Sequence, residues 1–233
     1  MATKSGNSIG LVLSDFTGSY FGILLKQASV SADCMGKQLL IVDGHNQAES
    51  ELKAVHSLVE KKCDVIVLYS RMLSSEQIIA LNQSIEIPIV NVGRQLPPEA
   101  GYSIAFDQKN AVKMAVDHLI DSGHRDITYI GPKPVTPTSI SRSQGFTQAI
   151  ESHSTLTIES RKRMCEFGFI EGYAAGKAFA AEGRWNTAIV AASDDIATGY
   201  IKAFTEEGIH VPNDISIVSI DNDPYSAFIE PAL

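Results

Sequence analysis

Short apolar runs alternate with amphipathic segments along the whole chain, and this alternation constrains the fold more than any other feature. The run at 8–14 (SIGLVLS) is continuously apolar, as is typical of a strand that is covered on both faces. The segment at 19–35 then places Phe21, Leu24 and Ala28 at helical spacing, and Gly36 ends it. Repeated strand–helix alternation predicts a parallel sheet with helices packed on its faces.

The same pattern runs through one series of elements, breaks at Ser122-Gly123-His124, and begins again. Two successive series predict an α/β protein with two similar doubly wound parallel-sheet lobes, at 1–122 and 123–233. The predicted strands are 8–14, 37–43, 64–69, 88–92, 102–106, 126–131, 161–167, 187–191 and 215–220, and the predicted helices are 19–35, 47–61, 75–84, 110–120, 139–152, 170–182 and 194–207.

Composition and motifs exclude several functional classes. The 233 residues include 27 acidic and 19 basic side chains, a net charge of −8 that repels the phosphates of nucleic acids. No apolar run is long enough to cross a bilayer and no export signal is recognisable, so we predict a cytoplasmic protein. Cys34, Cys63 and Cys165 are predicted to be buried free thiols, without a disulfide or metal framework. Dinucleotide-binding, P-loop and nucleophile-elbow motifs are absent, so we predict neither a cofactor nor an enzyme.

Polar residues stand where strand-like runs give way to loops, at Asp15, Asp107, Arg142, Ser193 and Asp221. In parallel α/β sheets, ligands bind at the carboxyl ends of the strands, so these side chains predict one cleft for a small polar molecule. Arg142 is expected in the first turn of a helix, where its charge opposes the helix dipole. Its planar guanidinium could clamp vicinal hydroxyls or a carboxylate, and the alternative is a solvated surface arginine.

Each of the other candidates has a structural alternative. Asp15 can accept hydrogen bonds from ligand hydroxyls or cap a helix. Ser193 is expected to be an N-cap that can still present its hydroxyl to the cleft. Asp221 opens an Asp-Asn-Asp sequence, but the rest of a calcium loop is absent, so a ligand contact is favoured over a metal site. Aromatic side chains can stack on a sugar or pack in the core, and those near the first strand are Phe16, Tyr20 and Phe21.

Seven segments, in this order and spacing, resemble the LacI/GalR family of bacterial transcriptional regulators over nearly the whole chain: LVLSDFTGSYFGILL, CDVIVLYSR, IPIVNVGRQ, SGHRDITYIGP, SISRSQGF, IVAASDDIATGYIKAF and VPNDISIVSIDND. Within this family, YFGILLKQASVSADCMGKQLLIVDG and YSRML look closest to the β-glucoside (asc-type) repressors. The resemblance implies a periplasmic-binding-protein-like type I fold with a ligand cleft between its lobes.

The resemblance also implies roles for individual residues. Arg142 matches the arginine that clamps the effector, Asp221 matches the acid that accepts bonds from ligand hydroxyls, and Phe167 falls where an aromatic ring often stacks on the ligand. Ser193 departs from the Asn of many members, and Asn110 stands where some sugar-responsive members have Asp. The remaining implied pocket positions are Asp15, Phe16, Tyr20, Phe21 and Arg94.

As a function, the resemblance implies the effector-sensing domain of a homodimeric repressor, in which a sugar-like ligand controls affinity for operator DNA. The DNA-binding headpiece is expected outside this chain. A segment that completes the first lobe is expected beyond Leu233, because the family continues there. The alternative is a periplasmic sugar-binding protein of a transporter, which would have the same lobes and an export signal. An enzyme acting on sugars would need an acid–base or nucleophile set, and the sequence shows none.

Overall fold

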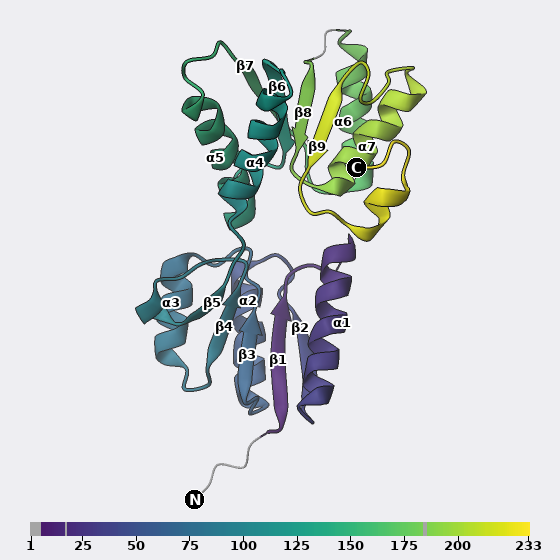
Figure 1. The fold of residues 1–233 in the computed structure, drawn as a ribbon. Coiled ribbons are helices and arrows are strands. Elements are labelled where there is room, and N and C mark those ends of the chain that lie inside the picture. Colours follow the sequence, from purple (N-terminus) through teal and green to yellow (C-terminus); the bar gives the residue numbers. More distant parts are fainter. Residues whose placement is uncertain (1–5, 17, 184–185) are drawn as a thin grey trace, which may run out of the picture. The chain divides into compact units, whose positions relative to one another are not determined.

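The computed structural model describes residues 6–16, 18–183 and 186–233, which form two compact units divided between Phe106 and Asp107 (Figure 1). Both units are built on a parallel sheet with helices on its two faces, so the predicted α/β architecture of two similar lobes is confirmed. Among the described residues, no helix is both long and apolar enough to cross a membrane.

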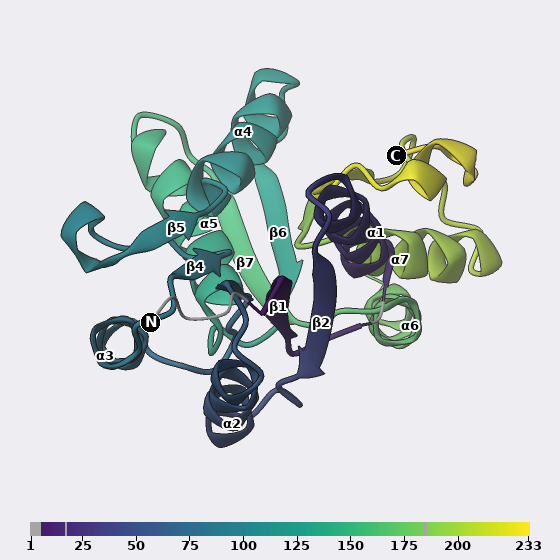
Figure 2. The same ribbon diagram turned by 90° about the horizontal axis from the view of Figure 1, so that it is seen from below.

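The first unit contains a five-stranded parallel sheet in the order β2-β1-β3-β4-β5. Helices α2 and α3 lie on one face of this sheet and α1 lies on the other (Figure 2). Gly10 allows α2 to approach β1 closely, because a Cβ at this position would lie 2.8 Å from a methyl group of Leu58. The elements are β1 (Ser8–Leu13), α1 (Gly18–Cys34), β2 (Gln38–Asp43), α2 (Ala48–Glu60), β3 (Val65–Leu68), α3 (Ser75–Ser84), β4 (Ile89–Val92), the short 3-10 helix η1 (Pro98–Ala100) and β5 (Tyr102–Ile104).

The second unit contains a four-stranded parallel sheet in the order β7-β6-β8-β9. Helices α4 and α5 cover one face and α6 and α7 the other (Figure 1). Gly199 lets α6 and α7 pack closely, since a Cβ there would lie 2.4 Å from the backbone nitrogen of Tyr173. The elements are α4 (Gln108–Asp121), β6 (Asp126–Gly131), α5 (Pro137–Ser152), β7 (Glu159–Met164), α6 (Phe169–Ala181), β8 (Ala188–Ala191), α7 (Asp194–Glu206), β9 (Ser216–Ser219) and the 3-10 helix η2 (Pro224–Phe228).

The lobe boundary that we placed at 122/123 assigns α4 to the first lobe, whereas α4 packs in the second unit. Val112, Val116 and Leu119 on this helix are buried in the hydrophobic core of the second unit. The junction between the compact units therefore precedes α4, at Phe106–Asp107.

Three local predictions need correction. Helix α5 begins at Pro137, where Thr136 caps it, so Arg142 lies in the second turn and not the first. Strand β7 ends at Met164, which leaves Phe167 in the loop that follows it. Cys34 is exposed, because it ends α1 on the solvent side, while Cys63 and Cys165 are buried as predicted.

Candidate functional site

Arg142 is the centre of a polar cluster at the carboxyl edge of the second sheet. Its side chain is buried, with 7% exposed. The guanidinium Nε donates to Oε1 of Gln108 at 2.7 Å, Nη2 donates to Oδ1 of Asp221 at 3.0 Å, and Nη1 donates to the carbonyl oxygen of Ala192. These partners come from α4, from the loop after β9 and from the end of β8, so one arginine ties three elements together.

Asp221 occupies an unusual backbone conformation in the loop after β9. Its φ angle is 124° and that of Asn222 is 58°, both in the region that L-residues seldom adopt. Burial raises the pKa of Asp221 to about 6, although the positive charge and hydrogen bond of Arg142 oppose this shift. Strained backbone and a perturbed carboxylate together are typical of functional positions.

Ser193 and Asp194, at the start of α7, hold this edge in place. Ser193 caps α7, accepting the N–H of Ile196 at 3.3 Å, as predicted. The buried carboxylate of Asp194 accepts bonds from Ser219 Oγ at 2.5 Å and from the backbone N–H of Asp223 at 2.7 Å. Asp194 therefore fixes the loop that carries Asp221.

Phe167 and Asn110 differ in their surroundings. Phe167 is partly buried and packs against the second hydrophobic core, just after β7 at the same sheet edge as Arg142. Asn110 lies exposed in the first turn of α4, where its backbone N–H donates to the capping carboxylate of Asp107 at 3.0 Å. On that helix the contact to Arg142 is made by Gln108, which is not among the residues predicted to bind the ligand.

In the first unit, Asp15 follows β1 and pairs with Arg71, which follows the neighbouring strand β3. Oδ2 of Asp15 lies 3.0 Å from Nη1 of Arg71, and both side chains are partly buried. The loop that carries Arg71 is held by Glu51 of α2, a carboxylate with no exposed surface. This carboxylate accepts hydrogen bonds from the hydroxyls of Ser14 and Ser70 and from the backbone N–H groups of Arg71, Met72 and Leu73.

Three aromatic rings form a cluster at this edge of the first sheet. The ring centroids of Tyr20 and Phe21 are 5.1 Å apart, and Phe21 and Tyr69 meet edge to face at 5.3 Å. Phe16 is 41% exposed in the loop between β1 and α1. These aromatic side chains are thus only partly buried, and a ligand can stack only on a ring that is at least partly exposed.

Arg94 follows β4, the next strand after β3 in the sheet. Among the described residues its one hydrogen bond joins Nη1 to the hydroxyl of Ser75 at 3.5 Å, and its Nε is buried without a partner. Burial lowers the pKa of the Arg94 guanidinium, while the charges of Glu51 and Glu76 oppose that shift.

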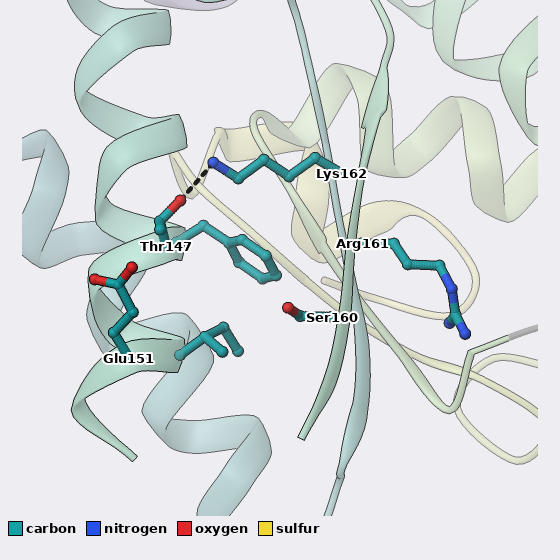
Figure 3. Close-up of a pocket in the computed structure, with 7 residues that line it drawn as sticks. Thr147, Glu151, Ser160, Arg161 and Lys162 are labelled. Carbon is teal, nitrogen blue, oxygen red and sulfur yellow. Dashed lines mark hydrogen bonds between the residues drawn. The ribbon is translucent and has the colours of Figure 1, made fainter. Parts of the chain in front are cut away.

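A groove with a volume of about 310 Å³ lies between α5 and the edge strand β7, away from these clusters (Figure 3). Lys162 reaches from β7 across this groove to Thr147 at 2.6 Å and to the carbonyl oxygen of Ser143 at 2.8 Å. Arg161 points to the other side of the strand and pairs with Asp126. The cations around the groove are thus already bound within the protein.

The ten predicted ligand-binding residues therefore divide between two sheet edges, each described by itself. Asp15, Phe16, Tyr20, Phe21 and Arg94 belong to the first unit, and Asn110, Arg142, Phe167, Ser193 and Asp221 belong to the second. Within the described ranges, no group of three or more His, Cys, Asp or Glu side chains could hold a metal ion.

Comparison with known proteins finds transcriptional regulators among the proteins similar to this chain. A family model described as a periplasmic binding protein-like domain matches residues 116–233. The chain is 32% identical to the HTH-type transcriptional regulator AscG of Escherichia coli, over 100% of the chain and 70% of that protein. It is 27% identical to the regulator GalR of Escherichia coli, over 100% of the chain and 68% of GalR. The crystal structure of the Escherichia coli repressor ascG matches with a TM-score of 0.85 and 31% identity, covering 97% of this chain and 83% of that one.

Proposed function

This chain belongs to the LacI/GalR family of transcriptional regulators, and we propose that it is the effector-sensing domain of a DNA-binding repressor. The proposed effector is a sugar or sugar-like molecule. Its binding would shift the equilibrium between two conformations that differ in affinity for operator DNA. The relatives are transcription regulators and not enzymes or transport proteins, so the periplasmic alternative is not favoured and we place the protein in the cytoplasm.

The observation that carries this proposal is the pair formed by Arg142 and Asp221. A guanidinium has five N–H donors, and the contacts of Arg142 with described residues use three of its nitrogen atoms once each. Asp221 uses Oδ1 for Arg142, and among the described residues no hydrogen bond involves its Oδ2. Donors and an acceptor side by side suit the paired hydroxyls of a sugar.

A ligand screen with one variant tests the proposal. Sugars, including β-glucosides, are expected to raise the melting temperature of the wild type by mass action. Asp221→Ala should weaken binding of the best sugar by about 2 kcal/mol, measured by calorimetry, because a partner of the buried Arg142 is lost. Asp214→Ala, which removes an exposed acid paired with His210, is the matched control. An unchanged affinity in Asp221→Ala would remove the site assignment.

We further propose that the domain forms a homodimer through an apolar patch on the second unit. The rings of Phe169 and Tyr225 lie 5.4 Å apart and join the start of α6 to η2. Beside them, Ile170 is 78% exposed and Phe228 is 89% exposed. Clustered exposed apolar side chains mark protein interfaces, and a second copy of the same patch would cover them.

Ile170→Glu is expected to convert the dimer into a monomer with little loss of stability in each protomer, because the side chain contributes little to the core. Sedimentation velocity at micromolar concentration would show this change. Val135→Glu is a matched control, since Val135 is 70% exposed in the loop between β6 and α5, outside the patch formed by α6 and η2. A variant with Glu at 170 that stays dimeric would place the interface elsewhere.

A further inference from the structure

The hydroxyl of Tyr129 on β6 is buried and has no hydrogen-bond partner among the residues that the structure describes. The whole residue is only 2% exposed. Burying a polar group without a partner costs free energy, so buried tyrosine hydroxyls usually have one. The hydroxyl of Tyr225 in the same unit follows this rule and donates to Oδ1 of Asp195 at 2.7 Å. Tyr129 departs from it, although a phenylalanine ring would fill the same space without that cost.

Packing fixes this hydroxyl at the carboxyl end of β6. The ring of Tyr129 lies 5.5 Å from the ring of Phe146, which holds it between the sheet and α5. Gly131, the last residue of the strand, lies on the same face as Tyr129, and a Cβ there would come within 2.7 Å of the hydroxyl oxygen. A side chain at this position would therefore displace the hydroxyl from the edge of the sheet.

The same edge of the sheet carries the polar cluster around Arg142. A Cβ at Gly131 would also lie 2.8 Å from the Cβ of Ala192, whose carbonyl oxygen accepts a hydrogen bond from Arg142. Burial raises the pKa of Tyr129 to about 12, and the positive charge of Arg142 opposes this shift, so the guanidinium is near enough to act on the hydroxyl. The three nitrogen atoms of the guanidinium nevertheless donate to other groups. The hydroxyl of Tyr129 thus adjoins the pair formed by Arg142 and Asp221 without being used by it.

We propose that Tyr129 determines specificity in the second unit, by forming a hydrogen bond with one hydroxyl of the sugar that Arg142 and Asp221 hold. This inference rests on the function proposed above and adds a residue to its site. The contact is direct or passes through one ordered water molecule, which transmits a hydrogen bond nearly as well. A buried polar group placed for a ligand hydroxyl discriminates against an analogue that lacks this hydroxyl, because the group is then left without a partner.

The test measures, by calorimetry, the binding of D-glucose and of D-glucose analogues that each lack a single hydroxyl. In the wild type, one of these analogues is expected to bind about tenfold more weakly than D-glucose. Tyr129→Phe should bind D-glucose about tenfold more weakly and that analogue as the wild type does, because the same hydrogen bond is already absent. Its melting temperature without ligand should not fall, since the hydroxyl makes no hydrogen bond with the described residues. Tyr173→Phe makes the same change where the hydroxyl donates to Glu206, at the end of α7, and should leave every affinity unchanged.

The outcomes separate this inference from the proposed function. An unchanged affinity for D-glucose in Tyr129→Phe would overturn the role of Tyr129 and leave a sugar sensor. The same holds if the wild type and Tyr129→Phe lose equal affinity on removal of each sugar hydroxyl. A lower melting temperature without any change in affinity would show that the hydroxyl serves the fold and not the ligand. A wild type that binds neither D-glucose nor its analogues would count against both the sugar site and its use of Tyr129.

Discussion

Glu51→Gln is expected to destabilise the first unit by about 3 kcal/mol or more, since several buried donors lose their acceptor at once. In the wild type, both carboxylate oxygens accept hydrogen bonds from donors at the ends of β1 and β3. An amide replaces one of these oxygens by an NH₂ group, which faces donors and cannot accept from them. The loop that carries Arg71, the partner of Asp15, would open as a result.

Amide hydrogen exchange localises this effect. Protection of β1 and β3 should fall in Glu51→Gln, while β6 and β8 in the second unit keep the wild-type rates, because the two units have separate cores. Glu49→Gln is the control on the same helix, and it should change stability by less than about 0.5 kcal/mol since its side chain is 79% exposed. Equal effects of the two substitutions would show that the Glu51 carboxylate does not hold the loop that carries Arg71.

The order and type of the elements were predictable because apolar residues have one spacing in the strands and another in the helices. The predicted helix at 75–84 and the predicted strand at 126–131 coincide with α3 and β6. The lobe boundary was less predictable, because Ser122-Gly123 interrupts the pattern after α4 while the tertiary packing of α4 is with α5. Packing between elements far apart in sequence leaves no local signal.

Only part of the site was predictable, because some of its residues carry a signal in the local sequence and others do not. Arg142 and Asp221 stand at strand ends and meet in the structure, as the rule for parallel sheets implies. Glu51 was missed, although a signal existed: Glu51, Val55 and Leu58 share the buried face of α2, so an acid interrupts an apolar stripe. Gln108 gave no such signal, because nothing in its local sequence distinguishes it from a surface residue.

Arg142→Met is expected to destabilise the second unit by about 3–5 kcal/mol at pH 7, because it leaves the carboxylate of Asp221 without its cation. Gln108 and the carbonyl oxygen of Ala192 lose a donor in the same step. Urea denaturation followed by circular dichroism would measure the loss.

The pH dependence of the stability lost in Arg142→Met distinguishes an electrostatic cause from a packing defect. The pKa of Asp221 is about 6 in the folded protein against an ordinary value of 3.8. Between these values the folded state binds more protons than the unfolded state, so this carboxyl group makes the wild type less stable as the pH rises from about 4 to 6. Above pH 6 the contribution of Asp221 to the stability of the wild type no longer changes with pH. Arg142 lowers the pKa of Asp221, so removing the arginine raises it further and extends the decline to higher pH.

The stability difference between wild type and Arg142→Met should therefore widen as the pH rises from 6 to 8. Below pH 6 the difference should be smaller and nearly constant, because Asp221 then carries its proton in both folded proteins. Adding Asp221→Asn to the variant should remove the widening and leave only the part due to Gln108, Ala192 and the altered packing. A difference that stays constant from pH 5 to 8 would mean that the pair is not coupled, and Arg142 would then act mainly by joining β8 to α4.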